Sequence, residues 1–187
     1  QALLEDRQGH FWVGTDDGLD LVDRASGGII HYRHQRENPD SLNDSNVFSL
    51  YQDSAGLVWI GTATGGVSRW DPRSAELGAR QPEWVGKFVT TFADAPDNRV
   101  WIASMGGGVV EYDPDTGRKT DLDTIIGQHT ALENEPVMSL RQGRSGTLWI
   151  GTMDKGVATL DPHGKLTWMP VKRGDPLSKK LEEHPVF

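Results

Sequence analysis

Three kinds of residue in this sequence could carry chemistry, and a glycine pair is the first. Gly65-Gly66 could belong to a phosphate-binding loop. Such a loop needs the order Gly-x4-Gly-Lys-Ser/Thr and a helix directly after it. The residues that follow the pair, "VSRWDP", instead indicate a strand, and the same element occurs four times in the chain. The pattern therefore favours a turn over a phosphate site.

Histidines and carboxylates are the second kind. His31 and His34 are three residues apart in an expected strand, so their side chains point to opposite faces and do not form a zinc site. A glycosidase-like carboxylate pair is formally available, but six of the candidates occupy repeated turn positions: Asp6, Asp23, Asp53, Asp71, Asp113 and Asp161. Glu111 breaks the repeat, and we expect it to form an ion pair with Arg69 of the adjacent repeat. We expect no catalytic residue, no metal and no cofactor.

Tryptophans are the third kind, since they could stack on bases or sugars. Four of the seven share one motif position: Trp12, Trp59, Trp101 and Trp149. Their fixed place in the middle of a strand favours a structural role in the core between sheets, because aromatic side chains bury large areas. Trp84 lies in a variable segment and is the better candidate for stacking on a ligand.

The elements that position these residues form a repeat with a period of about 45 residues. The copies are "HFWVGTDDGLDLVD" (10–23), "LVWIGTATGGVSRWD" (57–71), "RVWIASMGGGVVEYD" (99–113) and "TLWIGTMDKGVATLD" (147–161). Each copy predicts two strands, b and c, and a further strand a and turn precede it. Segments 28–34, 82–88, 118–123 and 165–171 are candidates for a fourth strand, d. Four strands in such a period are typical of a β-propeller blade.

The turns between strands a and b support this interpretation. They carry Asp followed by Gly three residues later, as in Asp6/Gly9 and Asp53/Gly56. Asp can hydrogen-bond the turn backbone and Gly supplies a positive φ. In the third repeat we expect Asn98 to replace the glycine, and in the fourth Gln142 stands at the expected Asp position.

The motif resembles the two-component regulator propeller repeat. The resemblance rests on Leu/Val-Trp-Ile-Gly-Thr, Gly-Gly and Tyr/Trp-Asp-Pro and covers Ala2–Val171. It implies the periplasmic sensor region of a membrane-bound bacterial signalling protein, whose output is a histidine kinase or a diguanylate cyclase. Repeat three departs from the motif with Ala103-Ser104, and repeat four with Lys155-Gly156.

Composition excludes some functions. The 187 residues include no cysteine, which excludes disulfides. Their net charge is −8, which does not suit a nucleic-acid partner. No run of 18 apolar residues occurs, so we expect no membrane contact from this chain.

We expect one all-β domain, 1–187, with repeats at about 2–46, 47–88, 89–136 and 137–185. Val186-Phe187 matches the start of strand a, so 186–187 would begin a next blade, and the chain reads as a fragment of a longer protein. The four blades would form a partial propeller or be completed by oligomerisation. We expect self-association through the open edges, because exposed strand and inter-blade surfaces favour association.

Ligands would bind where loops vary on a rigid scaffold. In an antiparallel blade the b–c turn and the connection from strand d to the next strand a emerge at one end. The candidates at that end are Asp16, Asp17, Asn43, Thr64, Met105, Asn134 and Asp154, to which Trp84 is added. The alternative for each is a solvated turn residue.

The leading interpretation is a non-catalytic sensor that binds an extracytoplasmic small molecule, glycan or protein and regulates a linked output domain. A structural or protein-docking propeller is the first alternative. A propeller lyase or glycoside hydrolase is the second, and it would need an acid/base cluster that breaks the repeat.

Overall fold

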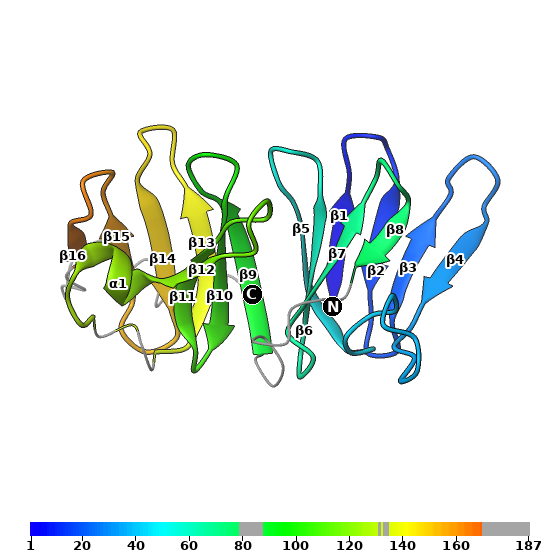
Figure 1. Ribbon diagram of the computed structural model, residues 1–187, viewed down its shortest axis with the longest axis horizontal. Coiled ribbons are helices and arrows are strands. Elements are labelled where there is room, and N and C mark those ends of the chain that lie inside the picture. Colours follow the sequence, from blue (N-terminus) through cyan, green and yellow to red (C-terminus); the bar gives the residue numbers. More distant parts are fainter. Residues whose placement is uncertain (79–87, 131, 133–134, 170–187) are drawn as a thin grey trace, which may run out of the picture.

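The computed structural model describes residues 1–78, 88–130, 132 and 135–169, which form four antiparallel four-stranded sheets. Each sheet uses four consecutive strands, a to d, and is called blade 1, 2, 3 or 4 in chain order. Figure 1 shows the blades side by side in that order, with blades 1 and 4 at opposite ends. The prediction of an all-β fold with four propeller-type blades is confirmed.

The strands are short and rich in β-branched and aromatic residues, as a pleated and packed sheet requires. Blade 1 contains β1 (Ala2–Glu5), β2 (Phe11–Gly14), β3 (Leu19–Val22) and β4 (Ile29–Tyr32). Blade 2 contains β5 (Val47–Gln52), β6 (Val58–Thr62), β7 (Val67–Asp71) and β8 (Glu76–Gly78). Blade 3 contains β9 (Phe88–Asp94), β10 (Val100–Met105), β11 (Gly108–Tyr112) and β12 (Lys119–Asp121). Blade 4 contains β13 (Val137–Gln142), β14 (Leu148–Thr152), β15 (Val157–Leu160) and β16 (Leu166–Trp168).

Strand d was the least predictable strand. In blade 2 it is β8, which precedes the expected segment 82–88; of that segment only Phe88 is described, and it begins β9. In blade 3 the strand is cut short by helix α1 (Leu122–Ile126). Strand d is the outermost strand and carries few buried residues, so its apolar pattern is weak.

The core lies between the blades, in three clusters of buried side chains. Trp12, Trp59 and Trp101 are 0%, 1% and 4% exposed, each in a cluster with residues of the next blade. Trp149 was expected in the core as well, and that prediction is wrong: it is 43% exposed. The physical reason is its position, because it stands on the face of blade 4 that points away from blade 3.

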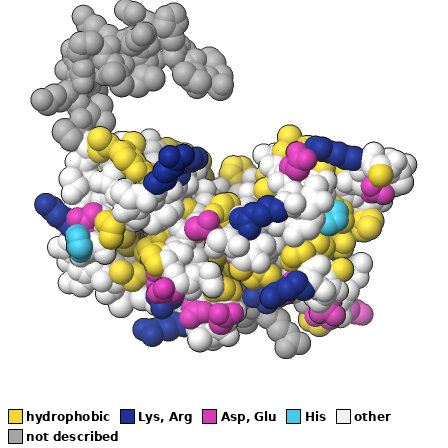
Figure 2. Space-filling view, turned by 90° about the horizontal axis from the view of Figure 1, so that it is seen from above, with side chains coloured by type: hydrophobic (Ala, Val, Ile, Leu, Met, Phe, Trp, Pro, Cys, Tyr) yellow, Lys and Arg dark blue, Asp and Glu magenta, His cyan; other side chains and the backbone are white. Residues whose placement is uncertain are grey.

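The blades form an open arc. Their first strands contact one another in the order β1, β5, β9 and β13, and no extensive contact joins β1 to β13 among the described residues. Figure 2, which looks along the strands, shows an outline that is hollowed between its two ends. Within the described residues, no helix is long and apolar enough to cross a membrane.

The a–b turns follow the expected chemistry with one correction. Asp6 and Asp53 accept hydrogen bonds from turn N–H groups, and Asn98 has a φ of 58°, which confirms that it replaces the turn glycine. Gln142 is not at the Asp position. Its Nε2 donates to the carbonyl of Gly146, as that of Gln52 does to Gly56, so Gly143 occupies the Asp position of blade 4.

Candidate binding face

The two ends of the sheets differ in their connections. We call the end with the a–b and c–d turns the hairpin end, which is uppermost in Figure 1, and the opposite end the loop end. The loop end carries the b–c turns and the connections between blades. These connections lie against the b–c turns, since Ala63 N–H donates to the Asn46 carbonyl and Met153 N–H to the Pro136 carbonyl. The expected grouping of the two kinds of loop is therefore present.

In blade 2 the structure brings two predicted residues, Asn43 and Thr64, into the same loop cluster. Asn43 Nδ2 donates to the carbonyl of Val67 at 2.6 Å, and its N–H donates to Ser68 Oγ at 3.0 Å. Thr64 donates from both its N–H and its hydroxyl to Asp44 Oδ2, at 2.9 and 2.7 Å. The polar groups of both residues thus hold the connection between blades 1 and 2 against strand c and the b–c turn of blade 2.

Asp44 is the anchor of this cluster, and the sequence did not single it out. Burial opposes its ionisation, but hydrogen bonds from Thr64 and from the N–H of Asn46 hold its pKa below the ordinary value. At neutral pH the ionised Asp44 therefore accepts hydrogen bonds that hold the connection against the b–c turn. The sequence does offer a signal for Asp44: an Asp in this connection can accept the backbone N–H of the residue two positions later, which is Asn46.

Blade 4 uses a different carboxylate for the same purpose. The buried Glu135 accepts the N–H of Asp154 at 3.2 Å and forms an ion pair with Lys155 Nζ at 3.0 Å. The hydrogen bond from Lys155 holds the pKa of Glu135 below its ordinary value. The predicted residue Asp154 contributes its backbone here, while its side chain stays exposed.

The other predicted binding residues are dispersed. Asp16 and Asp17 are exposed at the blade 1 turn, where Asp17 pairs with Arg33 at 2.6 Å, and Met105 is exposed in blade 3. Trp84 and Asn134 lie outside the described residues. The structure therefore gathers Asn43 with Thr64 but does not bring the full predicted set into one site, and their role in binding stays a prediction.

Two aromatic residues that the sequence reasoning missed lie at the loop end. Phe48 and Phe88 are half-buried, and their rings meet edge to face with centroids 4.5 Å apart. Phe88 pairs with Met105 across β9 and β10, so three large apolar side chains come from neighbouring first and second strands. Phe88 was assigned to a strand d, which hid this grouping. Aromatic faces of this kind pack against apolar or ring-shaped ligands.

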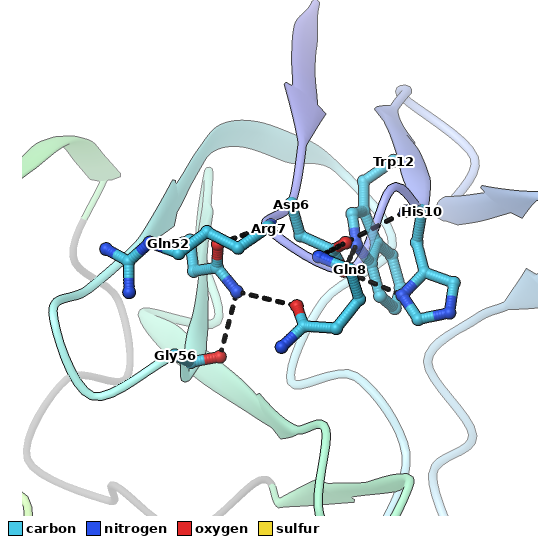
Figure 3. Close-up of polar contacts among 7 residues, drawn as sticks. All are labelled: Asp6, Arg7, Gln8, His10, Trp12, Gln52 and Gly56. Atoms are coloured by element: carbon cyan, nitrogen blue, oxygen red, sulfur yellow. Dashed lines mark hydrogen bonds and ion pairs between the residues drawn. The ribbon is translucent and has the colours of Figure 1, made fainter.

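The hairpin end is built as a network of fixed contacts, drawn in Figure 3. Asp6 Oδ2 accepts the indole N–H of Trp12 at 3.0 Å and lies 2.9 Å from His10 Nδ1. Burial opposes ionisation of Asp6, but the hydrogen bonds from Trp12 and His10 hold its pKa below the ordinary value. Asp53 accepts from Trp59 in the same way at 2.7 Å, yet burial raises the pKa of Asp53, because no histidine stands beside it and Asp94 adds negative charge.

Neighbouring blades are joined at this end by the last residue of strand a. Gln52 Oε1 accepts the N–H of Arg7 at 2.9 Å, and Gln52 Nε2 donates to Gln8 Oε1 and to the Gly56 carbonyl (Figure 3). Asp94 Oδ1 accepts the N–H of Ser54 in the same way at 2.9 Å. In blade 3 the position of the donor is occupied by Pro96, and proline has no backbone N–H to donate. Gln142 Oε1 accordingly has no hydrogen-bond partner within the described residues.

Two expectations about charged groups can be compared with the structure. Glu111 does not pair with Arg69 of the adjacent blade; it pairs with Arg99 of its own blade at 2.9 Å, so that prediction is wrong. Arg99 directly precedes the strand next to Glu111, which makes the local partner the nearer one.

The two histidines of blade 1 have separate partners: His31 contacts Asp20, and His34 contacts the Leu42 carbonyl. No group of three metal-ligating side chains occurs in the part of the chain that is described.

Comparisons with known proteins agree with this geometry. Residues 1–17, 41–64 and 131–154 match the family model described as two component regulator propeller. No curated protein sequence matches the chain. Among solved structures, the extracellular domain of a protein classed as a hybrid two component system from B. thetaiotaomicron is similar, with a TM-score of 0.75 and 19% identity. The match covers 93% of this chain and 25% of that one, so this chain spans about a quarter of its relative's length.

Propellers of other kinds are similar too. A second B. thetaiotaomicron extracellular domain, of a protein classed as a one component system, gives a TM-score of 0.70 at 20% identity over 90% of this chain and 22% of that one. Virginiamycin B lyase from Staphylococcus aureus gives 0.69 at 14% identity over 92% of this chain and 56% of that one. These likenesses show the fold alone. The repeat matches go further, because three separate segments of this chain match the family model for two component regulator propellers.

Proposed function

We propose that this chain is a non-catalytic sensor segment of a bacterial membrane signalling protein. It binds an extracytoplasmic small molecule or glycan at the loop end, in the periplasm, and regulates a linked histidine kinase or diguanylate cyclase. The observation that carries the proposal is the match of three segments to the regulator propeller family. The fold likeness to extracellular domains of two bacterial signalling proteins supports it.

The loop end supplies the contact surface in this proposal. Phe48, Phe88 and Met105 offer apolar faces, and Asp44 and the exposed Asp16 add negative charge nearby along the same end. A sugar ring or a ring-bearing metabolite has an apolar face that packs on such side chains, and it has hydroxyl groups that donate to carboxylates. The inter-blade hydrogen bonds of the hairpin end hold neighbouring blades together and so support this surface.

A lyase function is the alternative raised by the lyase neighbours. Among the described residues, the carboxylate–histidine pair whose carboxylate is fully buried is Asp6 with His10; it lies at the hairpin end, and Asp6 already accepts the Trp12 indole. General acid–base chemistry needs a group within reach of a bound substrate. This arrangement favours a structural role for the pair.

A thermal-shift screen with oligosaccharides and small metabolites tests the proposal. We expect at least one compound to raise the melting temperature, and Met105→Ser to remove the increase. His163→Ala, an exposed change in a hairpin-end turn, is the control and should leave the increase intact. Uniform failure to stabilise would favour a docking propeller, and turnover of a glycan would favour an enzyme. Autophosphorylation or cyclic dinucleotide synthesis by the intact signalling protein, with and without the compound, tests the regulatory step.

A further inference from the structure

The three observed interfaces between blades share one arrangement. In each, the tryptophan of strand b lies in a buried cluster with residues of the next blade's strand b. The sets are Trp12 with Val58 and Ile60, Trp59 with Val100 and Ile102, and Trp101 with Leu148 and Ile150. One face of each blade therefore carries the tryptophan, and the opposite face of the next blade receives it.

Blade 4 repeats the tryptophan face but leaves it open. Trp149 is 43% exposed and Val157 is 37% exposed. Val157 pairs with Gly151 across β14 and β15, as Val67 pairs with Gly61 in blade 2, and Val67 is only 2% exposed. These two side-chain positions, which the other three blades bury, are thus the ones that blade 4 presents to solvent.

Blade 1 presents the receiving face at the other end of the arc. Leu3 pairs with Val13, as Leu50 pairs with Ile60 and Leu140 with Ile150. Leu50 and Leu140 pack in the inter-blade clusters, whereas Leu3 is 67% exposed. Blade 1 therefore carries the two apolar positions that receive a tryptophan face, and within the described residues no blade packs against them.

Polar groups at the two free faces also complement each other. At the blade 1–2 and blade 2–3 interfaces, the last residue of strand a accepts an N–H from the residue after the turn position held by Asp6 and Asp53. At the free faces the corresponding residues are Glu5, an acceptor, and Arg144, which has an N–H and a positive charge. Glu5 now forms an exposed ion pair with Arg24. Contact between the free faces would place Arg144 beside Glu5.

From these observations we infer that the Trp149 face of blade 4 binds the Leu3 face of blade 1 in a second copy of this chain. The contact is head to tail and continues the arrangement of the three interfaces within the chain. Trp149 packs on Leu3 and Val13 of the second copy, and the Arg144 N–H donates to its Glu5. A heterologous contact of this kind closes into a ring or extends as a filament, depending on the rotation between copies.

Light scattering on the purified chain tests association. We expect a mass at least twice the 20.6 kDa of one chain. Leu3→Glu and Trp149→Glu should each weaken association at least about tenfold, because each places a charge in an apolar contact. Ile125→Glu, a change at a comparably exposed apolar residue on α1, is the matched control and should have no effect. A monomer at all concentrations would overturn the inference.

Mixing experiments test the head-to-tail geometry. Leu3→Glu chains keep an intact Trp149 face and Trp149→Glu chains keep an intact Leu3 face, so a mixture should form a one-to-one complex. The chain has no cysteine, so Glu5→Cys and Arg144→Cys chains can be mixed under oxidising conditions. We expect a disulfide between the two different variants. Crosslinking of each variant only with itself, or a Leu3→Glu chain that stays dimeric, would show a face-to-same-face contact and overturn the inference.

Discussion

Trp59 donates its indole N–H to Asp53 at 2.7 Å, and this bond ties strand b of blade 2 to its a–b turn. Blade 3 lacks the bond. Ala95 occupies the position that Asp53 has in blade 2, because the N–H of each donates to the carbonyl of the residue four positions later. Trp101 Nε1 is therefore buried without a hydrogen-bond partner among the described residues. A buried donor without an acceptor costs stability.

Ala95→Asp should supply the missing acceptor and raise the free energy of unfolding by about 1 kcal/mol at neutral pH. Chemical denaturation measures the change. Gly143→Asp is the control, because it introduces the same carboxylate beside Trp149, whose side chain is partly exposed. We expect a smaller gain there. Equal gains in both blades would show that burial of the indole is not the cause.

Gln52 and Gln142 occupy the same position in blades 2 and 4 but differ in their bonds. Among the described residues, the Gln52 side chain makes three hydrogen bonds, two of them to blade 1, whereas the Gln142 side chain makes one, within its own blade. Gln52→Ala should therefore lower the free energy of unfolding by about 1–2 kcal/mol more than Gln142→Ala. Urea titrations of the two variants provide the comparison. A larger loss for Gln142→Ala would contradict the inter-blade role of Gln52.

The repeat made much of this fold predictable from sequence. Trp12, Trp59 and Trp101 are buried because strand b is flanked by a second blade, and Asn98 adopts the positive φ of a turn glycine. Both outcomes depend on sequence features that recur along the chain, namely the tryptophan of strand b and the residue that closes the a–b turn. A feature that recurs can be read from one chain without a structure.

The predictions that were wrong or missed depend on features found at one position of the fold, which the repeat does not reveal. Trp149 has the same local sequence as the buried tryptophans, but its exposure depends on whether another blade follows. Glu111 forms its ion pair with Arg99 because Arg99 lies beside it in the folded sheet, and sequence spacing alone does not show which charged groups lie close together. The loop-end grouping of Phe48 and Phe88 required the true start of β9, which lies in a segment that does not repeat.

Asp6 and Asp53 should give opposite pH dependences. The pKa of Asp6 is lowered in the folded state, so its stabilising contribution is present above its ordinary value and is lost as the pH falls through the folded value. The pKa of Asp53 is raised, so its contribution is greatest below its ordinary value and falls as the pH rises through the folded value.

The corresponding variants, Asp6→Asn and Asp53→Asn, test this contrast in unfolding experiments between acid and neutral pH. The destabilisation by Asp6→Asn should shrink as the pH is lowered below the ordinary Asp value. The destabilisation by Asp53→Asn should shrink as the pH is raised above that value. Parallel trends in the two variants would mean that His10 and Asp94 do not set the difference.

Gly61 and Gly151 test how closely blades approach one another. A methyl group at Gly61 would lie 2.8 Å from Val89 Cγ1 of blade 3, and it would also meet Ser49 Oγ. At Gly151 the three nearest atoms all belong to Ser139 of the same blade. Gly61→Ala should therefore lower the free energy of unfolding by about 1–2 kcal/mol more than Gly151→Ala, since overpacking forces the blades apart.

Denaturation of both variants under conditions that keep the chain monomeric, for example in a Leu3→Glu background, isolates this effect. The serine contact is common to both sites, so the difference between the two losses reports on the contact with Val89. Equal losses at the two sites would assign the glycine to the fit within a blade. A larger loss at Gly61 would assign it to the fit between blades, which is the fit that Gly151 offers to a further blade.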